Sequence, residues 1–280
     1  MDKLPIYLSN PNDLVTLPDV YFRVRDLVHQ GAGTHEISQV VSLDPALTVR
    51  FLSIANSALF SPNTEIGTVS RAVTLLGTQL VHDIVLASSV SDLFDGIPKE
   101  VIDVRSFWAK SVTCGAIAKS LAEQLQMVDS GHVFVQGLLA EIGHVVMYQY
   151  ESENMIEIMS LAKALGAKTY KIEREKLGYD YCDVGGYLAE QWDLPAGIPE
   201  TTLYHQEPAT TDEFRFEASI VHIAHRLCEF KNQQVIDPDF DPVALQSIRL
   251  SEQEVMGVYE DISAEIDIVI SSFSGVKAAA

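Results

Sequence analysis

The sequence predicts an all-α fold, and three observations carry this prediction. Almost every periodic stretch of the 280 residues places apolar side chains three or four positions apart, as on one face of a helix. No stretch alternates apolar and polar residues convincingly, as a half-buried strand would. Residues that begin and end helices stand between the periodic stretches. We therefore expect a multi-helix protein without a sheet.

Apolar faces with helical spacing follow one another along the chain. They consist of Val20, Val24, Leu27 and Val28; Leu47, Phe51, Ile54 and Ala55; Phe107, Cys114, Ala118, Leu121 and Leu125; Phe134, Leu138, Ile142 and Val145; Val184, Tyr187, Leu188 and Gln191; Phe216, Ile220, Ile223 and Leu227; and Val255, Val258, Ile262, Ile266, Val269 and Phe273. The face that starts at Phe134 predicts a helix that continues through residues 140 and 141.

Helix-end signals support the same fold. Asp44 before Pro45 places a capping carboxylate ahead of a residue whose φ suits the first helical turn. Gly77 follows an apolar stretch and can end a helix in a conformation that other residues avoid. Residues 251–254, Ser-Glu-Gln-Glu, form a capping-box pattern before the last apolar face. Each signal falls beside a periodic stretch, so the two kinds of observation agree.

Two further pairs of residues are expected to end helices rather than to carry chemistry. Asn56 and Ser57 suit a helix end because both side chains bond nearby backbone groups. Ser57 has no histidine or aspartate at local spacing, which argues against a nucleophilic serine. Trp192 and Pro195 mark another helix end, since proline cannot continue a helix and the large ring is expected to be buried.

Composition limits the classes of function. With 39 acidic and 19 basic residues, the chain carries a formal charge of −20. Such a field repels nucleic-acid phosphates and anionic membrane surfaces, so we expect neither as a partner. The apolar share of 47% is enough for a real hydrophobic core. The acidity favours a basic protein partner only weakly, because it also serves solubility.

The expected location is cytoplasmic. No segment at the start of the sequence has the pattern of a secretory signal, and no apolar run approaches the roughly 20 residues that cross a bilayer. Cys114, Cys182 and Cys228 are too widely spaced for a CxxC site or a disulfide framework. Free thiols on helical stretches fit a reducing compartment.

Three ordered blocks carry a resemblance to a known family. The first runs from Asp44 to Ser57 and the second from Ile66 to Gly77. The third starts at Phe107-Trp108, continues through Gly137-Leu-Leu-Ala-Glu-Ile-Gly143 and ends with Trp192-Asp-Leu-Pro195 and His205. Together they resemble the HDOD family, bacterial signal-transduction domains related to the HD metal-dependent phosphohydrolases. The resemblance implies an N-terminal helical bundle packed on a degenerate HD-like bundle.

The resemblance covers about residues 14–210, which we take as an HDOD domain. We expect its front bundle to span about 10–94 and its HD-like bundle about 101–210, with a dividing loop at 95–98. Residues 211–275 are expected to form C-terminal helices that complete the HD-like bundle.

The resemblance also places the ancestral metal positions of the HD superfamily. Lys110 stands where the first HD histidine is expected, and its protonated amine has no lone pair to offer a cation. Ala140 and Glu141 stand at the His-Asp pair, so only a carboxylate remains there. The other positions correspond to Tyr181, to His205 within Tyr-His-Gln-Glu-Pro, and to His225 in place of the closing aspartate.

These positions define a candidate vestigial pocket, to which we add His144 because it lies three residues after Glu141 on one helix side. Its members are Lys110, Glu141, His144, Tyr181, His205 and His225. A metal phosphohydrolase needs several ligands on its ion to make hydroxide near neutral pH. The substitutions remove ligands or add positive charge, so we expect no metal, no cofactor and no catalytic residue. A salt bridge from Glu141 to Lys110 or His225 is expected instead.

The favoured function is a non-catalytic signal-transduction or protein-interaction module that acts on an unidentified signalling protein. One alternative is a divergent metal-dependent phosphohydrolase or cyclic-nucleotide phosphodiesterase, with Lys110 holding phosphate and with the ligands Glu141, His144, His205 and His225. A second alternative is a metal-free small-molecule sensor that uses the vacated pocket. No glycine-rich phosphate loop occurs in the sequence, so nucleotide binding through such a loop is not expected.

Overall fold

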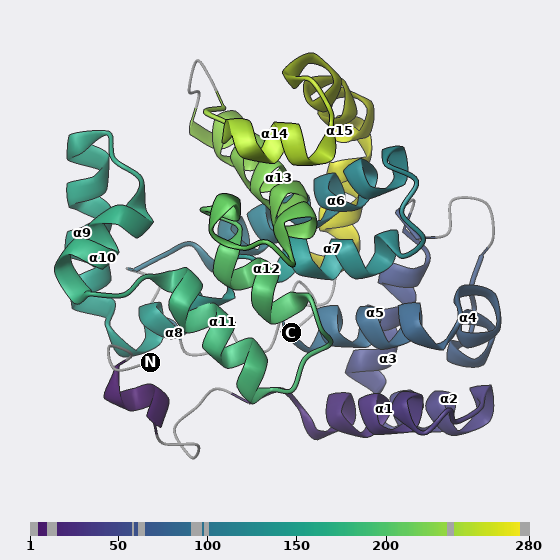
Figure 1. Ribbon diagram of the computed structural model, residues 1–280. Helices are drawn as coiled ribbons and strands as arrows, with labels where there is room; N and C mark the ends of the chain where they lie inside the picture. The colour runs from purple at the N-terminus through teal and green to yellow at the C-terminus, as the bar shows by residue number, and fades with distance from the viewer. Residues whose placement is uncertain are drawn as a thin grey trace. The chain divides into compact units, whose positions relative to one another are not determined.

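The computed structural model describes residues 5–9, 16–57, 59–60, 65–90, 97, 101–233 and 238–274. Within these residues every regular element is a helix, which confirms the all-α prediction (Figure 1). The helices group into two compact units, each made of separate stretches of the chain. The expected dividing loop at 95–98 lies outside the described residues except for Ile97.

Unit 2 comprises residues 17–92, 112–138 and 251–280. Its helices are α1 (Asp19–His29), α2 (Thr34–Ser42), α3 (Pro45–Ala55), α4 (Val69–Leu76), α5 (Thr78–Val90), the later part of α6 (Val104–Gln124), most of α7 (Ser130–Leu139) and α15 (Glu252–Ser274). α5 packs against α1, α3 and α4, and α15 packs on α3. Tyr21, Phe51 and Val85 are completely buried in this core.

The helix ends expected in unit 2 are present. Asp44 caps α3 by accepting a hydrogen bond from the Leu47 N–H at 3.0 Å. Gly77 follows α4 with φ of +82°, in the region that favours glycine. At the start of α15 the Ser251 hydroxyl accepts from the Glu254 N–H, and the Glu254 carboxylate accepts from the Ser251 N–H. These caps satisfy backbone groups that helix ends otherwise leave unpaired.

Asn56 and Ser57 hold the end of α3, as expected from their types. The Asn56 amide donates to the carbonyls of Leu52 and Ile66, both at 2.8 Å, and its oxygen accepts from the Ile66 N–H at 2.7 Å. The Ser57 hydroxyl donates to the Ile54 carbonyl at 2.7 Å. Both side chains therefore have a structural role.

Gly137 allows α6 and α7 to approach closely. A Cβ atom at this position would lie 2.9 Å from the Cys114 carbonyl oxygen and 3.0 Å from the Ala118 Cβ. Such contacts are shorter than a side chain tolerates, so only glycine fits this crossing.

Unit 1 comprises residues 1–16, 93–111 and 139–250 and contains the candidate site. Its elements are η1 (Ile6–Ser9), the start of α6, α8 (Ile142–Tyr150), α9 (Ser152–Leu165), α10 (Thr169–Leu177), α11 (Tyr181–Gln191), α12 (Ile198–Tyr204), η3 (Pro208–Thr210), α13 (Arg215–Gln233) and α14 (Pro242–Ile248). α11 packs on α8 and α12, and α13 packs on α12 and α14. α9 and α10 lie side by side as a hairpin (Figure 1).

These units differ from the continuous front and rear bundles expected from the sequence. Residues 112–138 and α15 group with α1 to α5, whereas α13 and α14 group with the candidate site. Of the apolar face predicted for α15, Val255, Val258 and Ile266 are buried, and the side chains of Val269 and Phe273 lie outside the described part of the chain. The apolar period does not identify the helix that covers this face. That helix is α3, which is distant in sequence.

α8 and α11 cross at two glycines. A Cβ atom on Gly143 would lie 2.0 Å from the Tyr181 carbonyl oxygen and 2.7 Å from the Gly185 nitrogen. A Cβ atom on Gly185 would lie 3.1 Å from the Gly143 nitrogen. The two helix backbones are therefore in contact, and this contact places the first residue of α11 against the helix that follows Glu141.

α11 ends where Trp192 and Pro195 predicted a helix end. The helix stops at Gln191, and Trp192 is buried at the C-cap. Pro195 follows, and its carbonyl accepts a hydrogen bond from the Ile198 N–H at 3.1 Å.

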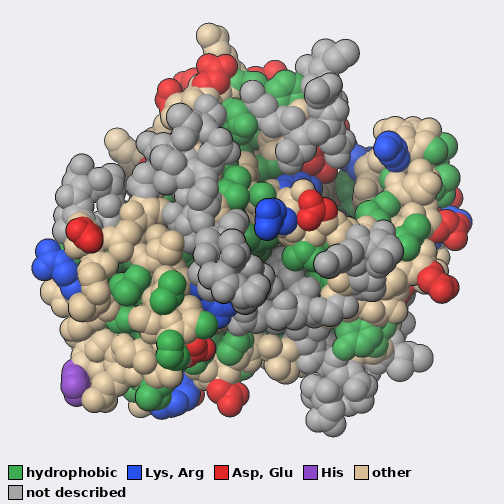
Figure 2. Space-filling view, turned by 180° about the vertical axis from the view of Figure 1, so that it is seen from behind, with side chains coloured by type: hydrophobic (Ala, Val, Ile, Leu, Met, Phe, Trp, Pro, Cys, Tyr) green, Lys and Arg blue, Asp and Glu red, His purple; other side chains and the backbone are tan. Residues whose placement is uncertain are grey.

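Within the described residues, no helix combines the length and the apolar character needed to cross a bilayer. On the face shown in Figure 2, acidic and basic side chains are interspersed over the described surface. The excess negative charge is therefore not gathered in one area of that face.

We expect Gly143→Ala to destabilise unit 1 by about 3 kcal/mol, since overpacking at a rigid backbone crossing has costs of this order. Circular dichroism during urea unfolding measures the loss. Gly257→Ala is the matched control, because Gly257 also lies in a helix but has open space around its Cα. The control should be neutral or slightly stabilising, since alanine favours helices. Equal stability of the two variants would contradict the crossing.

Candidate functional site

The site starts at a turn between two helices. α7 ends at Leu139 and α8 begins at Ile142, while Glu141 occupies the N-cap of α8 with φ of −104° and ψ of 18°. The continuous helix expected from Phe134 onward is therefore wrong at residues 140 and 141. The apolar spacing stays in phase across the turn, so periodicity alone cannot detect it. The break leaves Glu141 at the start of a helix whose direction is set by its crossing with α11.

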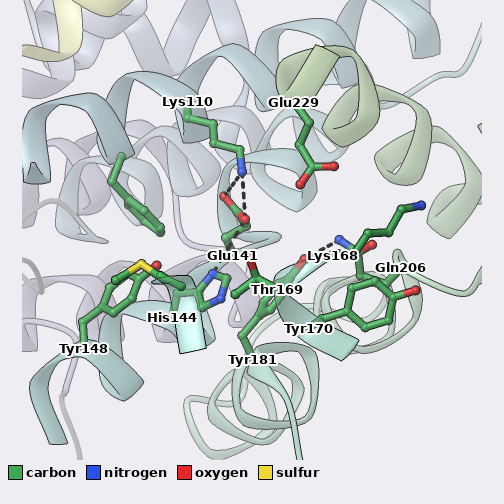
Figure 3. Close-up of a pocket in the computed structure, with 12 residues that line it drawn as sticks. Lys110, Glu141, His144, Tyr148, Lys168, Thr169, Tyr170, Tyr181, Gln206 and Glu229 are labelled. Carbon is green, nitrogen blue, oxygen red and sulfur yellow. Dashed lines mark hydrogen bonds and ion pairs between the residues drawn. The ribbon is translucent and has the colours of Figure 1, made fainter. Parts of the chain in front are cut away.

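Lys110 and Glu141 form the central ion pair. The Lys110 ammonium lies 2.9 Å from Oε1 and 2.8 Å from Oε2 of Glu141. The two side chains point toward each other from α6 and from the turn before α8 (Figure 3). Their exposed fractions are 21% and 10%, so the pair is largely shielded from water. The salt bridge expected from the sequence is confirmed, and it occupies both oxygens of the single carboxylate at the His-Asp position.

The ion pair shifts the pKa values of its own two groups, Glu141 and Lys110. Burial alone would raise the pKa of Glu141, but the Lys110 ammonium and then the neighbouring His225 hold that pKa well below its usual value. Burial alone would lower the pKa of Lys110, but Glu141 and then Glu229 raise it above its usual value. Both groups are therefore charged at neutral pH.

His225, on α13, faces the same carboxylate. Its Nε2 lies 3.1 Å from Glu141 Oε1. Its Nδ1 lies 3.3 Å from the Gln206 side-chain nitrogen. The Gln206 oxygen accepts a hydrogen bond from Arg226 at 2.6 Å, so its nitrogen must be the donor. In this network Nδ1 of His225 accepts from Gln206, so Nε2 carries the proton; Nε2 lies close to Glu141 but its geometry makes no hydrogen bond with the described residues.

Tyr181 and His205 form the next part of the network. Nδ1 of His205 lies 2.9 Å from the Thr202 carbonyl and must donate to it, because a carbonyl only accepts. Nε2 of His205 is then the acceptor for the Tyr181 hydroxyl at 3.0 Å. Gln206 donates to the same hydroxyl. Burial, followed by the nearby His225, lowers the pKa of His205 well below its usual value, so the ring is neutral.

His144 lies against Glu173, a residue that sequence reasoning missed. Nε2 of His144 is 2.8 Å from Glu173 Oε1, and the Tyr181 N–H donates to Glu173 Oε2 at 3.0 Å. The His144 ring also stacks on the Tyr181 ring, with centroids 4.0 Å apart. Glu173 is completely buried, although it belongs to the charged stretch 171–176, which is typical of an exposed helix. Its sequence context gives no signal of burial.

Burial alone would lower the pKa of His144, but Glu173 and then Glu141 raise that pKa above its usual value. The ring is therefore held toward its protonated form. Nδ1 of His144 is 3.7 Å from Glu141 Oε1, which is too long for a hydrogen bond. This buried nitrogen has no hydrogen-bond partner among the described residues.

The structure thus brings all six predicted pocket residues into one network in unit 1. Gln206 and Arg226 were also missed, but each directly follows a predicted histidine. This position next to a predicted histidine is the one sign in the sequence that Gln206 and Arg226 could belong to the network. Glu229, one turn after His225 on α13, accepts a hydrogen bond from Arg226 and completes this edge of the network.

A divalent ion does not fit this donor set. The Lys110 ammonium already contacts both oxygens of Glu141. The acceptor nitrogen of His205 is engaged by the Tyr181 hydroxyl, and that of His222 by the Asp241 N–H at 3.0 Å. No group of three or more potential ligand residues with suitable geometry occurs in the described part of the chain. Placing an ion here would require displacing Lys110 and breaking two of these bonds.

A small cavity opens beside the ion pair, with a volume of about 130 Å³ (Figure 3). Its wall combines aromatic side chains with paired charges. The lining includes Phe107, Lys110, Glu141, His144, Tyr148 and Thr169. The cavity thus adjoins the ion pair and offers both charged and aromatic side chains to its interior.

The fold and the network define an all-helical domain with an internal ion pair at the centre of its candidate site. A model of the HDOD domain family matches residues 14–208. The chain therefore belongs to the HDOD family. This agrees with the resemblance seen in the three sequence blocks.

Solved structures share this fold. A protein of Geobacter sulfurreducens, described as an HDOD domain protein with unknown function, is 23% identical with a TM-score of 0.76, and the match covers 94% of this chain and 93% of that one. A protein of Shewanella amazonensis SB2B, provisionally named a phosphohydrolase, is 24% identical with a TM-score of 0.76, covering 95% and 97%. A protein of Marinobacter aquaeolei VT8, provisionally named a signal transduction protein, is 19% identical with a TM-score of 0.71, covering 95% and 60%.

An uncharacterized protein of Treponema pallidum (strain Nichols) is 20% identical over 263 residues. The match covers 91% of this chain and 50% of that protein, so the chain spans about half the length of this curated relative.

We expect Lys110→Met to destabilise unit 1 by about 3 kcal/mol, because it leaves the Glu141 carboxylate buried without its ammonium. The double variant Lys110→Met/Glu141→Gln should recover most of the loss, since it removes the charge as well as its partner. Both tryptophans, Trp108 and Trp192, lie in unit 1, so their fluorescence during urea unfolding follows this unit. A double variant no more stable than the single one would show that the pair is not the central contact.

The buried His222 ring is expected to make the stability of the fold sensitive to acid. Burial, followed by the nearby Arg226, lowers the pKa of His222 to about 3. The unfolded chain takes up this proton near pH 6.5 but the folded chain does not, so stability falls as the pH drops from about 6.5 toward 3. His222→Gln should reduce the slope of unfolding free energy in this range by about 1.4 kcal/mol per pH unit. An unchanged slope in urea unfolding at several pH values would contradict a buried neutral ring.

Proposed function

We propose that this chain is a non-catalytic signal-transduction module of the HDOD family, which acts through protein interaction rather than through turnover. The observation that carries the proposal is the contact of the Lys110 ammonium with both oxygens of Glu141. An HD phosphohydrolase needs a metal ion at this place to make a nucleophilic hydroxide. A tethered ammonium supplies the positive charge but has no open coordination position for water.

The neighbouring residues support the same proposal. A general base or metal ligand must present a lone pair to the site. His205 and His225 instead use their acceptor nitrogens within the network formed by Tyr181 and Gln206. His144 directs Nε2 to Glu173. The acceptor nitrogens of His205 and His225, which a base or a metal ligand would use, are thus engaged within the protein.

The provisional phosphohydrolase name belongs to the Shewanella protein. That protein shares only its fold with this chain. For this chain, a phosphohydrolase mechanism would need Lys110 to leave Glu141. The signal-transduction name of the Marinobacter protein is compatible with a module of this kind. The partner would be a signalling protein, and the excess of acidic residues favours one with a basic surface.

Protein purified without chelator should contain far less than stoichiometric metal, because the carboxylate is already occupied. With Mn²⁺, Mg²⁺, Fe²⁺ or Ni²⁺ added, hydrolysis of bis(p-nitrophenyl) phosphate should not exceed the rate of the Glu141→Gln control. Elemental analysis and a colorimetric assay measure the two quantities. Stoichiometric metal together with turnover that Glu141→Gln abolishes would overturn the proposal.

A further inference from the structure

The cavity beside Lys110 contains hydrogen-bond donors that the protein itself does not satisfy. An ammonium has three N–H groups, and the two short contacts of Lys110 with Glu141 leave at least one N–H for another acceptor. His144 lies in the same wall and its side chain is 5% exposed; its Nδ1 faces Glu141 Oε1 at 3.7 Å, beyond hydrogen-bond reach, and has no hydrogen-bond partner among the described residues. Buried donors without acceptors are costly, so an acceptor from outside the chain would stabilise both.

The N-terminus of α10 borders the same cavity. This helix begins at Thr169, and its N-cap residue, Lys168, makes no side-chain cap. Thr169 and Tyr170, the first two residues of the helix, line the cavity. The first N–H groups of a helix and its dipole favour an anionic ligand. Residues of α6, α8 and the start of α10 thus line one space, although these helices are separate in sequence.

The carboxylates around the cavity limit the charge of that ligand. Glu141 is neutralised by Lys110, and Glu229 lies in an ion pair with Arg226. Lys168 is paired with Asp239 at 2.5 Å. These pairs leave the surroundings close to neutral, which tolerates a single negative charge. A doubly charged phosphate would meet Glu141 and Glu229 at close range and is disfavoured.

The rest of the wall is apolar. Phe107, Tyr148 and Met159 line the cavity, and the rings of Phe107 and Tyr148 lie edge to face with centroids 6.1 Å apart. Aromatic rings and a thioether bind a flat hydrocarbon group well. The cavity therefore has a donor-rich part and an apolar part, as sites for small organic ligands commonly do.

We propose that this cavity binds a small organic monocarboxylate, whose oxygens accept hydrogen bonds from Lys110 and His144 and whose apolar body packs on Phe107 and Tyr148. The inference rests on the proposed function, because the ligand would be the input that a non-catalytic module senses. Binding would join α6, α8 and α10 through one molecule.

The test uses the full chain with benzoate as the probe, benzamide as its neutral counterpart, and inorganic phosphate as the dianionic comparison. Benzoate should raise the thermal midpoint in a concentration-dependent way, since it binds only the folded state. Benzamide and phosphate should have much smaller effects. Isothermal titration then gives the affinity. Metal content and hydrolysis are measured separately, so a failure here leaves the proposed function standing.

His144→Gln is the informative variant, because glutamine can still donate to Glu173 but offers no second donor to the cavity. It should weaken benzoate binding about tenfold, the effect of losing one hydrogen bond to a charged group. His35→Gln, at an exposed histidine of unit 2, should bind as the wild type does.

If His144→Gln does not fold, the wild-type ligand series alone decides the question. No response of the wild type to benzoate, phenylacetate or butyrate would overturn the proposal. An equal response to benzoate and benzamide, or a stronger response to phosphate than to benzoate, would also overturn it.

Discussion

The ion pair between Lys110 and Glu141 is the contact on which the organisation of unit 1 depends. It joins α6 to the turn before α8, two segments that lie far apart in sequence. Because both groups are largely buried, neither can be left alone without a cost of several kcal/mol. The remaining polar groups of the site are arranged around this pair, and their protonation follows from it.

The hydrogen-bond directions form one consistent set. Arg226 fixes the orientation of the Gln206 amide, and Gln206 then donates to Tyr181 and His225. Tyr181 in turn donates to His205, whose other nitrogen donates to the Thr202 carbonyl. Each group has a single role compatible with its neighbours. Satisfied networks of this kind rigidify the side chains that take part in them.

The sequence predicted the helical architecture well because helix signals are local. Asp44, Asn56 and the capping box at 251–254 act on residues within one or two turns, and all of them have the expected contacts. The grouping of helices was not predictable in the same way, since the apolar face of α15 does not specify α3 as its cover. The break at residues 140 and 141 was hidden because the apolar period continues across it.

The sequence predicts the part of the site in which a buried charge requires a partner of opposite charge. It does not predict the remaining residues of the site. A buried carboxylate at the His-Asp position requires a cation, and Lys110 was a candidate by its place in the family pattern. Glu173 could not be found, because a glutamate among charged residues is ordinarily exposed. Its burial depends on the glycine crossing of Gly143 and Gly185, which brings the Tyr181 backbone and the His144 ring to the same carboxylate.

The Lys110 ammonium at the centre of unit 1 differs from a bound metal ion in what can regulate it. A metal ion binds with an affinity that depends on pH and on its supply, so a metal centre can be emptied. The Lys110 ammonium is covalently attached, and the carboxylates around it keep it charged. The central ammonium of unit 1 is therefore retained whatever the supply of metal ions. The cavity beside the pair and the outer helix surfaces are the places where another component can act.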